Sequence, residues 1–486
     1  MIVDLLERAE DGADADLRLV LIAEDESAPG LCEIRDGMAA HGKVTFLYGG
    51  GGNQTSALLG LGNADLLDSE KLRRAAGIAS RTISREGFRS VAVRLELRST
   101  FPSLEEMIEA WVEGWLLGAY TFDKYKSNVL PRRDGKLSLG CAKPFDRERC
   151  AEAVRRARLR ADATMLARDW CNEPANVLTP EQLTKRIEKL FNERPGTSVN
   201  VFRGDDLELH DMNGLRAVAQ GSRQKPALVE VAYAGDPSKP LISLVGKGMT
   251  FDMGGMNVKT GRDLSEARFD MGGAGAVIGA LDLLIRAEAP VNVVALVAVA
   301  DNVPGAGALL PSSIVRYPNG LNVQVANTDA EGRLILADAL LYAQRLGSSD
   351  IIDIATLTGS VGHALGLRVA GVWGDAVITE SLRTVGDRCG DRVWPMPLVD
   401  DDDALLRSDY ADISNISSSA YGGAGAAALF LRRFIGSGVR WAHVDMANTV
   451  QSPSDRGYET IGATGFGVRL LADYVIRSQA SASNAD

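Results

Sequence analysis

The chain of 486 residues is too long for one ordinary hydrophobic core, so two or three domains are expected. Its hydrophobic fraction of 45% and charged fraction of 24% are typical of globular proteins, and its net charge of −11 argues against nucleic acid as the main partner. The longest apolar stretch, residues 291–300, is too short to cross a bilayer, and the acidic N-terminus lacks a secretory signal pattern.

The first part of the chain alternates between strand-like and helix-like segments. Helical periodicity covers residues 70–87 and 103–119. The strand-like segments are rich in Leu and Val and cover residues 17–24, 43–50, 56–63 and 90–97. We therefore predict an N-terminal α/β domain at 1–145 that includes a polar linker at 120–136. The glycine run at 49–52 lacks a phosphate-binding motif and is expected to be a flexible turn.

A connecting segment at 146–175 follows, with a charged helical pattern over residues 146–170. A larger domain is expected at 176–478, where strands again alternate with helices. Its strand candidates are nearly continuous apolar runs at 240–248, 291–300, 321–328 and 350–359. Such runs favour a buried, mostly parallel sheet, so the fold class is α/β. The composition of residues 479–486 is that of a disordered tail.

Polar side chains follow two of these strands, where open α/β sheets bind their ligands. Lys247 and Asp252 lie at and just after the end of the strand at 240–248, and the stretch NTDAEGRLILADAL begins at the end of the strand at 321–328. One interpretation of Asp329 and Glu331 is helix capping, because acidic side chains stabilise a helix N-terminus. Capping does not explain Arg333, whose charge opposes the helix dipole.

A metal site accounts for more of these side chains. Four histidines and the lack of an HExxH motif argue against a histidine-ligated zinc protease, so carboxylates would have to hold any metal. Three aspartates and a glutamate supply enough oxygen ligands for two divalent cations, which at roughly 3.5–4 Å apart activate a bridging water. Two lysines beside four acids are also compatible with plain ion pairing, and the residue pattern alone leaves both interpretations open.

Several motifs resemble those of the leucyl aminopeptidase (M17) family, the cytosol aminopeptidases. They are VGKGMTFDMGG (245–255), NVKTG (257–261), FDMGGA (269–274) and NTDAEGRL (327–334). Supporting similarities are FDKYKS (122–127), NEPANVLTP (172–180), ATLTG (355–359) and WAHVDMANT (441–449). The resemblance extends from about residue 120 to residue 471 and, more weakly, through the N-terminal domain.

The resemblance implies a macro-like N-terminal α/β domain and a zinc-exopeptidase-like catalytic domain with a mostly parallel central sheet. It implies an enzyme that hydrolyses N-terminal residues from short peptides, with two divalent ions, Mn²⁺ or Zn²⁺, as cofactors. The implied metal ligands are Lys247, Asp252, Asp270, Asp329 and Glu331. Family members are homohexamers, and a cytoplasmic location agrees with five scattered cysteines that lack CxxC spacing.

The resemblance also implies separate roles for three basic side chains. Lys247 would bind a metal as a neutral amine, which burial among cations favours. Lys259 would stay protonated and stabilise the oxyanion of the scissile carbonyl. Arg333 would hold a bicarbonate ion that shuttles a proton, which gives this arginine a purpose that capping does not.

Two alternative functions remain beside this interpretation, and one residue differs from the family's usual pattern. Some relatives bind DNA as architectural factors, and an inactive metal-binding scaffold is a further alternative. The acidic composition weighs against the first, and the presence of Lys259 and Arg333 weighs against the second. The departure is Ala267, which stands where many relatives have a methionine that lines the pocket for the first side chain. The side-chain preference therefore does not follow from the resemblance.

Overall fold

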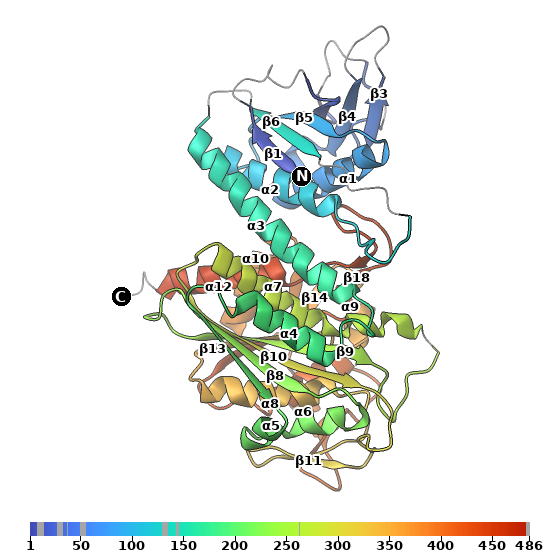
Figure 1. The fold of residues 1–486 in the computed structure, drawn as a ribbon, viewed down its shortest axis with the longest axis vertical. Coiled ribbons are helices and arrows are strands. Elements are labelled where there is room, and N and C mark those ends of the chain that lie inside the picture. The colour runs from blue at the N-terminus through green and yellow to red at the C-terminus, as the bar shows by residue number, and fades with distance from the viewer. Residues whose placement is uncertain are drawn as a thin grey trace. The chain divides into compact units, whose positions relative to one another are not determined.

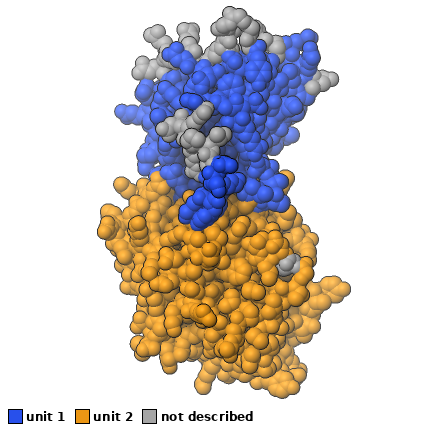
Figure 2. All heavy atoms as spheres, turned by 45° about the vertical axis from the view of Figure 1, so that its right-hand side comes forward, with its two compact units in different colours: residues 1–165, 452–461 blue, residues 166–451, 462–486 orange. Residues whose placement is uncertain are grey.

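The structure is a computed structural model that describes residues 1–6, 14–26, 33–35, 37–48, 55–128, 135–141, 145–261 and 263–482. It divides into two compact units (Figure 2). The N-terminal unit comprises Met1–Met165 together with Ser452–Ile461, and the C-terminal unit comprises Leu166–Gln451 and Gly462–Asp486. The chain therefore returns to the N-terminal unit for ten residues near its end, which the sequence does not signal.

The N-terminal unit contains one sheet of order β1-β6-β5-β2-β4-β3 (Figure 1). Its strands are β1 (Ile2–Leu5), β2 (Leu17–Ala23), β3 (Val44–Leu47), β4 (Thr55–Gly62), β5 (Ser90–Leu95) and β6 (Lys136–Cys141). Its helices are η1 (Ala64–Leu66), α1 (Ser69–Arg85), α2 (Leu104–Gly118) and most of α3 (Arg147–Asn172). Neighbouring strands run parallel except for β3, which is antiparallel to β4.

The predicted elements of this unit are confirmed, but β1 and β6 were not predicted. Strand β6 begins at Lys136, the last residue of the predicted polar linker. Strand β6 forms because its apolar residues lie between β1 and β5, a tertiary pairing that local composition does not encode. The turn expected at 49–52 lies outside the described residues.

The excursion Ser452–Ile461 is built into the core of the N-terminal unit. Tyr458 is 3% exposed and belongs to the same apolar cluster as α1 and α2. A Cβ atom on Gly77 would lie 2.5 Å from the Tyr458 Cα atom, so the helix needs glycine there. Arg81 donates hydrogen bonds to the carbonyl oxygens of Gly457 and Glu459 at 2.8 and 3.2 Å. The segment is thus part of the unit rather than a loop lying over it.

The C-terminal unit contains a mixed sheet of order β15-β14-β17-β13-β9-β10-β8-β7. Its strands are β7 (Thr197–Arg203), β8 (Ala227–Ala234), β9 (Ile242–Asp252), β10 (Asn292–Asn302), β13 (Asp350–Ala355), β14 (Ala370–Gly374), β15 (Val393–Pro395) and β17 (Arg440–Asp445). The four central strands β17, β13, β9 and β10 are mutually parallel, and β7 and β8 add an antiparallel edge. This confirms the predicted α/β class.

Helices cover both faces of this sheet (Figure 1). They are α4 (Pro180–Phe191), α5 (Asp205–Leu209), α6 (Asn213–Val218), α7 (Gly272–Arg286), α8 (Gly332–Arg345), α9 (Ser360–Leu365), α10 (Ala376–Cys389), α11 (Gly423–Arg432) and α12 (Val468–Ala482), with the short turns η2 (Ala219–Gly221), η3 (Leu264–Met271) and η4 (Asp400–Leu406). A Cβ on Gly246 would contact α7, and a Cβ on Gly332 of α8 would contact the next strand residue, Lys247. Because successive strand residues face opposite sides, α7 and α8 lie on opposite faces of β9. No helix in the described part of the chain is long and apolar enough to span a membrane.

Two predictions in this unit were wrong. Residues 321–328 do not form a strand of the main sheet, because β12 (Asn322–Gln324) pairs instead with β11 (Ile314–Arg316) and β16 (Ile413–Ser414) in a separate three-stranded sheet. The short strands β18 (Gln451–Ser452) and β19 (Gly462–Ala463) form a further two-stranded sheet. Residues 479–482, assigned to a disordered tail, belong to α12 because Gln479 donates to the carbonyls of Pro240 and Asn292. Residues 483–486 lie outside the described residues.

A buried carboxyl on α8 joins this helix to α6. The Asp338 carboxyl accepts a hydrogen bond of 2.7 Å from the Leu215 backbone N–H. Burial raises the pKa of Asp338 to about 8. The folded protein therefore keeps a proton that the unfolded chain releases near the ordinary value of 3.8.

We expect this proton to make stability depend on pH. Between pH 4 and pH 8 the folded state binds one more proton here than the unfolded state, so stability falls as pH rises, by about 1.4 kcal/mol per pH unit from this group. Asp338→Asn mimics the protonated form and removes the dependence. Its melting temperature relative to the parent should rise by on the order of 2 °C per unit from pH 5 to pH 7. The exposed Asp401→Asn is the charge-matched control, and equal pH profiles for the Asp338 variant and the parent would contradict the assignment.

Candidate metal centre

The carboxyl ends of the four central strands meet at one edge of the sheet. Strand β9 ends at Asp252, β10 at Asn302 and β17 at Asp445, and Thr356 directly follows β13. The strand predicted at 240–248 is longer than expected: β9 continues to Asp252, and Lys247 lies within it. The strand extends because Met249 pairs with Ala300 and Asp252 pairs with Asn302 of β10.

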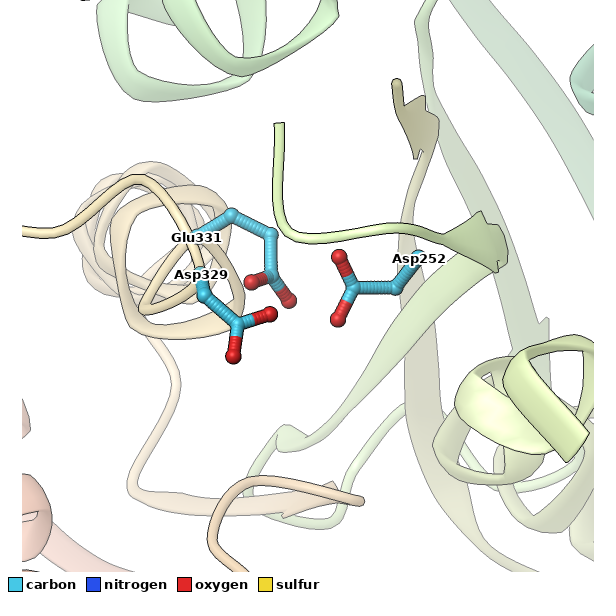
Figure 3. A group of neighbouring side chains, drawn as sticks. All are labelled: Asp252, Asp329 and Glu331. Carbon is cyan, nitrogen blue, oxygen red and sulfur yellow. The ribbon is translucent and has the colours of Figure 1, made fainter. Parts of the chain in front are cut away.

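Three of the predicted ligands form a compact acidic group (Figure 3). Asp252 comes from the end of β9, whereas Asp329 and Glu331 come from the loop before α8. One carboxylate oxygen from each residue lies within 4.8 Å of the other two, and the three carboxylates point toward one another. Like charges gathered in this way repel, so the arrangement favours a bound cation.

The helix-capping interpretation of these acids is wrong. Glu331 is the N-cap residue of α8, but its side chain makes no capping hydrogen bond, and Asp329 lies outside the helix. The Asp329 backbone is fixed instead by its neighbour, because its N–H donates to Asn327 Oδ1 at 2.8 Å. Both carboxylates are thereby left to face Asp252.

Two lysines lie among four acids, as the motifs predicted. The Lys247 Nζ atom is 2.8 Å from Asp270 Oδ2 and 2.8 Å from Glu331 Oε1. The Lys259 Nζ atom is 2.6 Å from Asp252 Oδ2 and also pairs with Asp329. Asp270 comes from η3, and its other oxygen accepts a hydrogen bond of 2.6 Å from the Thr356 hydroxyl. The structure therefore brings together all six residues from four separate motifs.

The pKa values of the acids reflect this crowding. Burial raises the pKa of Glu331 to about 8 and that of Asp270 to about 6, and the nearby Asp252 carboxylate adds to both shifts. Burial and Asp252 also raise the pKa of Asp329. Burial alone would lower the lysine pKa values, but the surrounding carboxylates outweigh it and raise the pKa of both Lys247 and Lys259. The acids hold more negative charge than two ammonium groups neutralise.

The residues present fit divalent cations. Glu331 Oε2 is buried and has no hydrogen-bond partner among the described residues, although buried polar atoms normally find one. Carboxylate oxygens without hydrogen bonds are suitable ligands for hard or borderline divalent ions. Ion pairs with Lys247 and Lys259 account for the carboxylate oxygens that face these lysines, but they leave Glu331 Oε2 unexplained, whereas a metal centre uses it.

Arg333 lies in the first turn of α8 and is 8% exposed. Its Nε atom is buried without a hydrogen-bond partner among the described residues. Burial lowers the pKa of Arg333 to about 10, although the carboxylates of Glu331 and Asp445 act in the opposite direction. The guanidinium group stays charged at neutral pH, so a buried donor next to the acids is available to an anion.

Other residues at this edge received no role from the sequence. Asn302 and Thr356 hold the carboxyl groups of Asp252 and Asp270. Asn415 supports the loop that carries Asp329, because its amide bonds to the backbone of Ala326 and Asn327. Thr356 lies in the ATLTG motif, which supported the family resemblance but assigned no role to the threonine. Asn302 and Asn415 lie in none of the motifs.

An α/β unit that gathers four acids and two lysines at the carboxyl edge of its sheet has the arrangement expected of a metal-dependent hydrolase. The catalytic-domain description of the cytosol aminopeptidase family matches residues 165–472, and the N-terminal-domain description of that family matches residues 29–129. The chain therefore belongs to the cytosol aminopeptidase family and is a metal-dependent peptide hydrolase.

Individual relatives agree with this assignment. The probable cytosol aminopeptidase of Geobacter sulfurreducens is 39% identical over 426 residues, covering 86% of this chain and 84% of the relative. That of Persephonella marina is 34% identical over 442 residues, covering 90% and 88%. A solved structure, the bottromycin maturation enzyme BotP in complex with Mn, is 32% identical, with a TM-score of 0.87, over 96% of this chain and 100% of that chain.

Proposed function

We propose that the chain is an aminopeptidase that removes N-terminal residues from short peptides at a centre of two divalent cations. The ligands would be Lys247, Asp252, Asp270, Asp329 and Glu331. The observations that support this most directly are the carboxylate oxygens of Asp252, Asp329 and Glu331 that lie within 4.8 Å of one another and the buried Glu331 Oε2 atom, which has no hydrogen-bond partner among the described residues. Two cations bound there would act as Lewis acids and lower the pKa of the attacking water.

The two lysines would have different tasks in this mechanism. Lys247 is fully enclosed between Asp270 and Glu331 and would bind as a neutral amine, because cations next to it oppose its protonation. Lys259 is somewhat more exposed, at 12% of its side chain, and would keep its proton. Its ammonium group would donate a hydrogen bond to the oxyanion that develops on the scissile carbonyl.

Arg333 would hold a bicarbonate ion. Bound there, bicarbonate would supply proton transfer toward the leaving amine. The unpartnered Nε atom and the burial of the guanidinium group support an anion at this position. The arginine itself would orient the anion and keep it charged. Removal of Arg333 should therefore affect turnover more than the binding of the cations.

Three further properties belong to this proposal. We infer a homohexamer and a cytoplasmic location from the family resemblance, and the buried thiols of Cys141, Cys150 and Cys171 form no disulfide bond. The cations are Mn²⁺ or Zn²⁺, and a related structure is described as a complex with Mn. Ala267 is 3% exposed in η3, so the first-residue pocket near Asp270 has a small side chain on that side.

The ion pairs made by the arginines of α3 argue against a nucleic-acid-binding surface on this helix. The Arg-rich part of this helix would be the candidate basic surface of a DNA-binding relative. Its arginines pair with acids, however: Arg155 with Glu152, Arg156 with Glu109 and Arg160 with Glu113. Pairing of this kind neutralises the charge that phosphate contacts would require.

A panel of amino-acid anilides and dipeptides tests the proposed function. The protein loaded with Mn²⁺ or Zn²⁺ should hydrolyse them from the N-terminus, and peptides with an acetylated N-terminus should not react. A chelated sample is the matched control. Equal release from acetylated and free peptides would contradict an aminopeptidase, and no release from any member of the panel would support the inactive scaffold instead.

A further inference from the structure

Asn302 stands opposite Asp252 because the pairing of β10 with β9 shifts at this point. Lys247 pairs with Ala298, so a regular ladder would place Asn302 opposite Phe251. The register shifts between Ala300 and Asn302, and Asp252 becomes the partner instead. A shift of one residue exchanges the faces of a strand, so this irregularity selects which side chain meets Asn302.

The Asn302 amide then joins the two segments that carry the acidic group. Its Nδ2 atom donates to Asp252 Oδ1 at 2.9 Å and to the Thr328 carbonyl oxygen at 3.0 Å. Both partners can only accept, so the amide nitrogen must face them and both of its hydrogens are used. With Asp252 Oδ1 occupied in this way, Asp252 Oδ2 is the oxygen that faces Lys259.

The surrounding backbone is shaped to this side chain. Gly255 has a φ of +61°, and a Cβ there would lie 2.6 Å from Asn302 Oδ1. The Thr328 hydroxyl donates to the Gly254 carbonyl at 2.6 Å, and the Thr328 N–H donates to Asn257 Oδ1 at 2.9 Å. The loop after β9 and the loop before α8 are therefore held together around Asn302, which is 3% exposed.

We propose that Asn302 is a positioning residue of the metal centre: its amide sets the orientation of the Asp252 carboxylate and the spacing between Asp252 and the Asp329–Glu331 segment. Asn302 itself has no carboxylate to offer a cation and acts through Asp252. The inference rests on the proposed metal centre. Groups that orient ligands in this way typically contribute about 10–100-fold in metal affinity.

Calorimetric titration of the chelator-stripped protein with Mn²⁺ tests the proposal. Asn302→Ala removes the amide, and Asn302→Leu removes it while roughly filling its volume without adding charge. Both variants should bind Mn²⁺ about 10–100-fold more weakly than the parent at one of the two sites or more. Asn292→Ala is the matched control: it lies at the other end of β10 and loses a hydrogen bond of 2.9 Å to the Lys239 carbonyl.

The control should keep the parent's Mn²⁺ affinity whatever it loses in melting temperature. Parent-like affinity in Asn302→Leu would overturn the proposal, because volume alone would then suffice. An equal loss of affinity in Asn292→Ala would also overturn it, because any weakening of β10 would then have the same effect. If Asn302→Ala does not fold, the leucine variant decides alone. Failure of the parent itself to take up Mn²⁺ would contradict the proposed function rather than the role of Asn302.

Discussion

Glu331→Ala and Asp329→Ala are expected to lose bound metal and peptidase activity together. Each substitution removes one of the three carboxylates whose oxygens lie within 4.8 Å of one another. Removal also leaves Lys247 or Lys259 with one counter-charge fewer, which further disfavours a cation nearby. Metal content after dialysis and turnover of a leucine anilide are the two measurements.

Glu230→Ala provides the matched control for this prediction. Glu230 is a buried glutamate in the same sheet, but it bonds to Asn200 and Tyr342 rather than to the acidic group. It should lose stability and keep its metal. Full activity in an exhaustively chelated parent sample would show that the carboxylates serve another purpose.

Lys259→Met should lower kcat by on the order of a hundredfold or more while the cations still bind. The reason is that Lys259 would donate to the developing oxyanion, whereas methionine has a similar length and no donor. Lys247→Met is the informative comparison, because it removes a proposed ligand and should weaken metal binding. Metal analysis beside kcat separates the two, and the opposite pattern would mean that the two lysine roles are exchanged.

The sequence predicted more of the candidate site than of the fold around it. In each motif the functional residues lie within a few positions of one another, so Asp329, Glu331 and Arg333 could be located together in one short stretch of sequence. Their meeting with Lys259 and Asp270 followed from family resemblance and from the rule that parallel strands end at one edge. The structure brings these residues together as expected.

What could not be predicted depends on pairings between distant segments. Nothing local in residues 321–328 indicates that β12 joins a small separate sheet, because its apolar pattern suits either location. Asn302 gains its position from a register shift against a strand 50 residues away in sequence. Gln479 turns a polar tail into the end of a helix through contacts with Pro240 and Asn292. Composition and periodicity contain none of this information.

The return of the chain to the N-terminal unit also constrains the order in which the protein folds. Tyr458 belongs to the apolar core of that unit, yet it is synthesised almost 300 residues after the unit's last preceding segment ends at Met165. A nascent N-terminal unit therefore waits for nearly the whole chain before its core is complete, and closing so long a loop slows folding. Until then Gly77 and Arg81 of α1 lack the backbone of residues 457–459 that they contact in the folded unit. We therefore expect the N-terminal unit to complete its core only after most of the C-terminal unit has been synthesised.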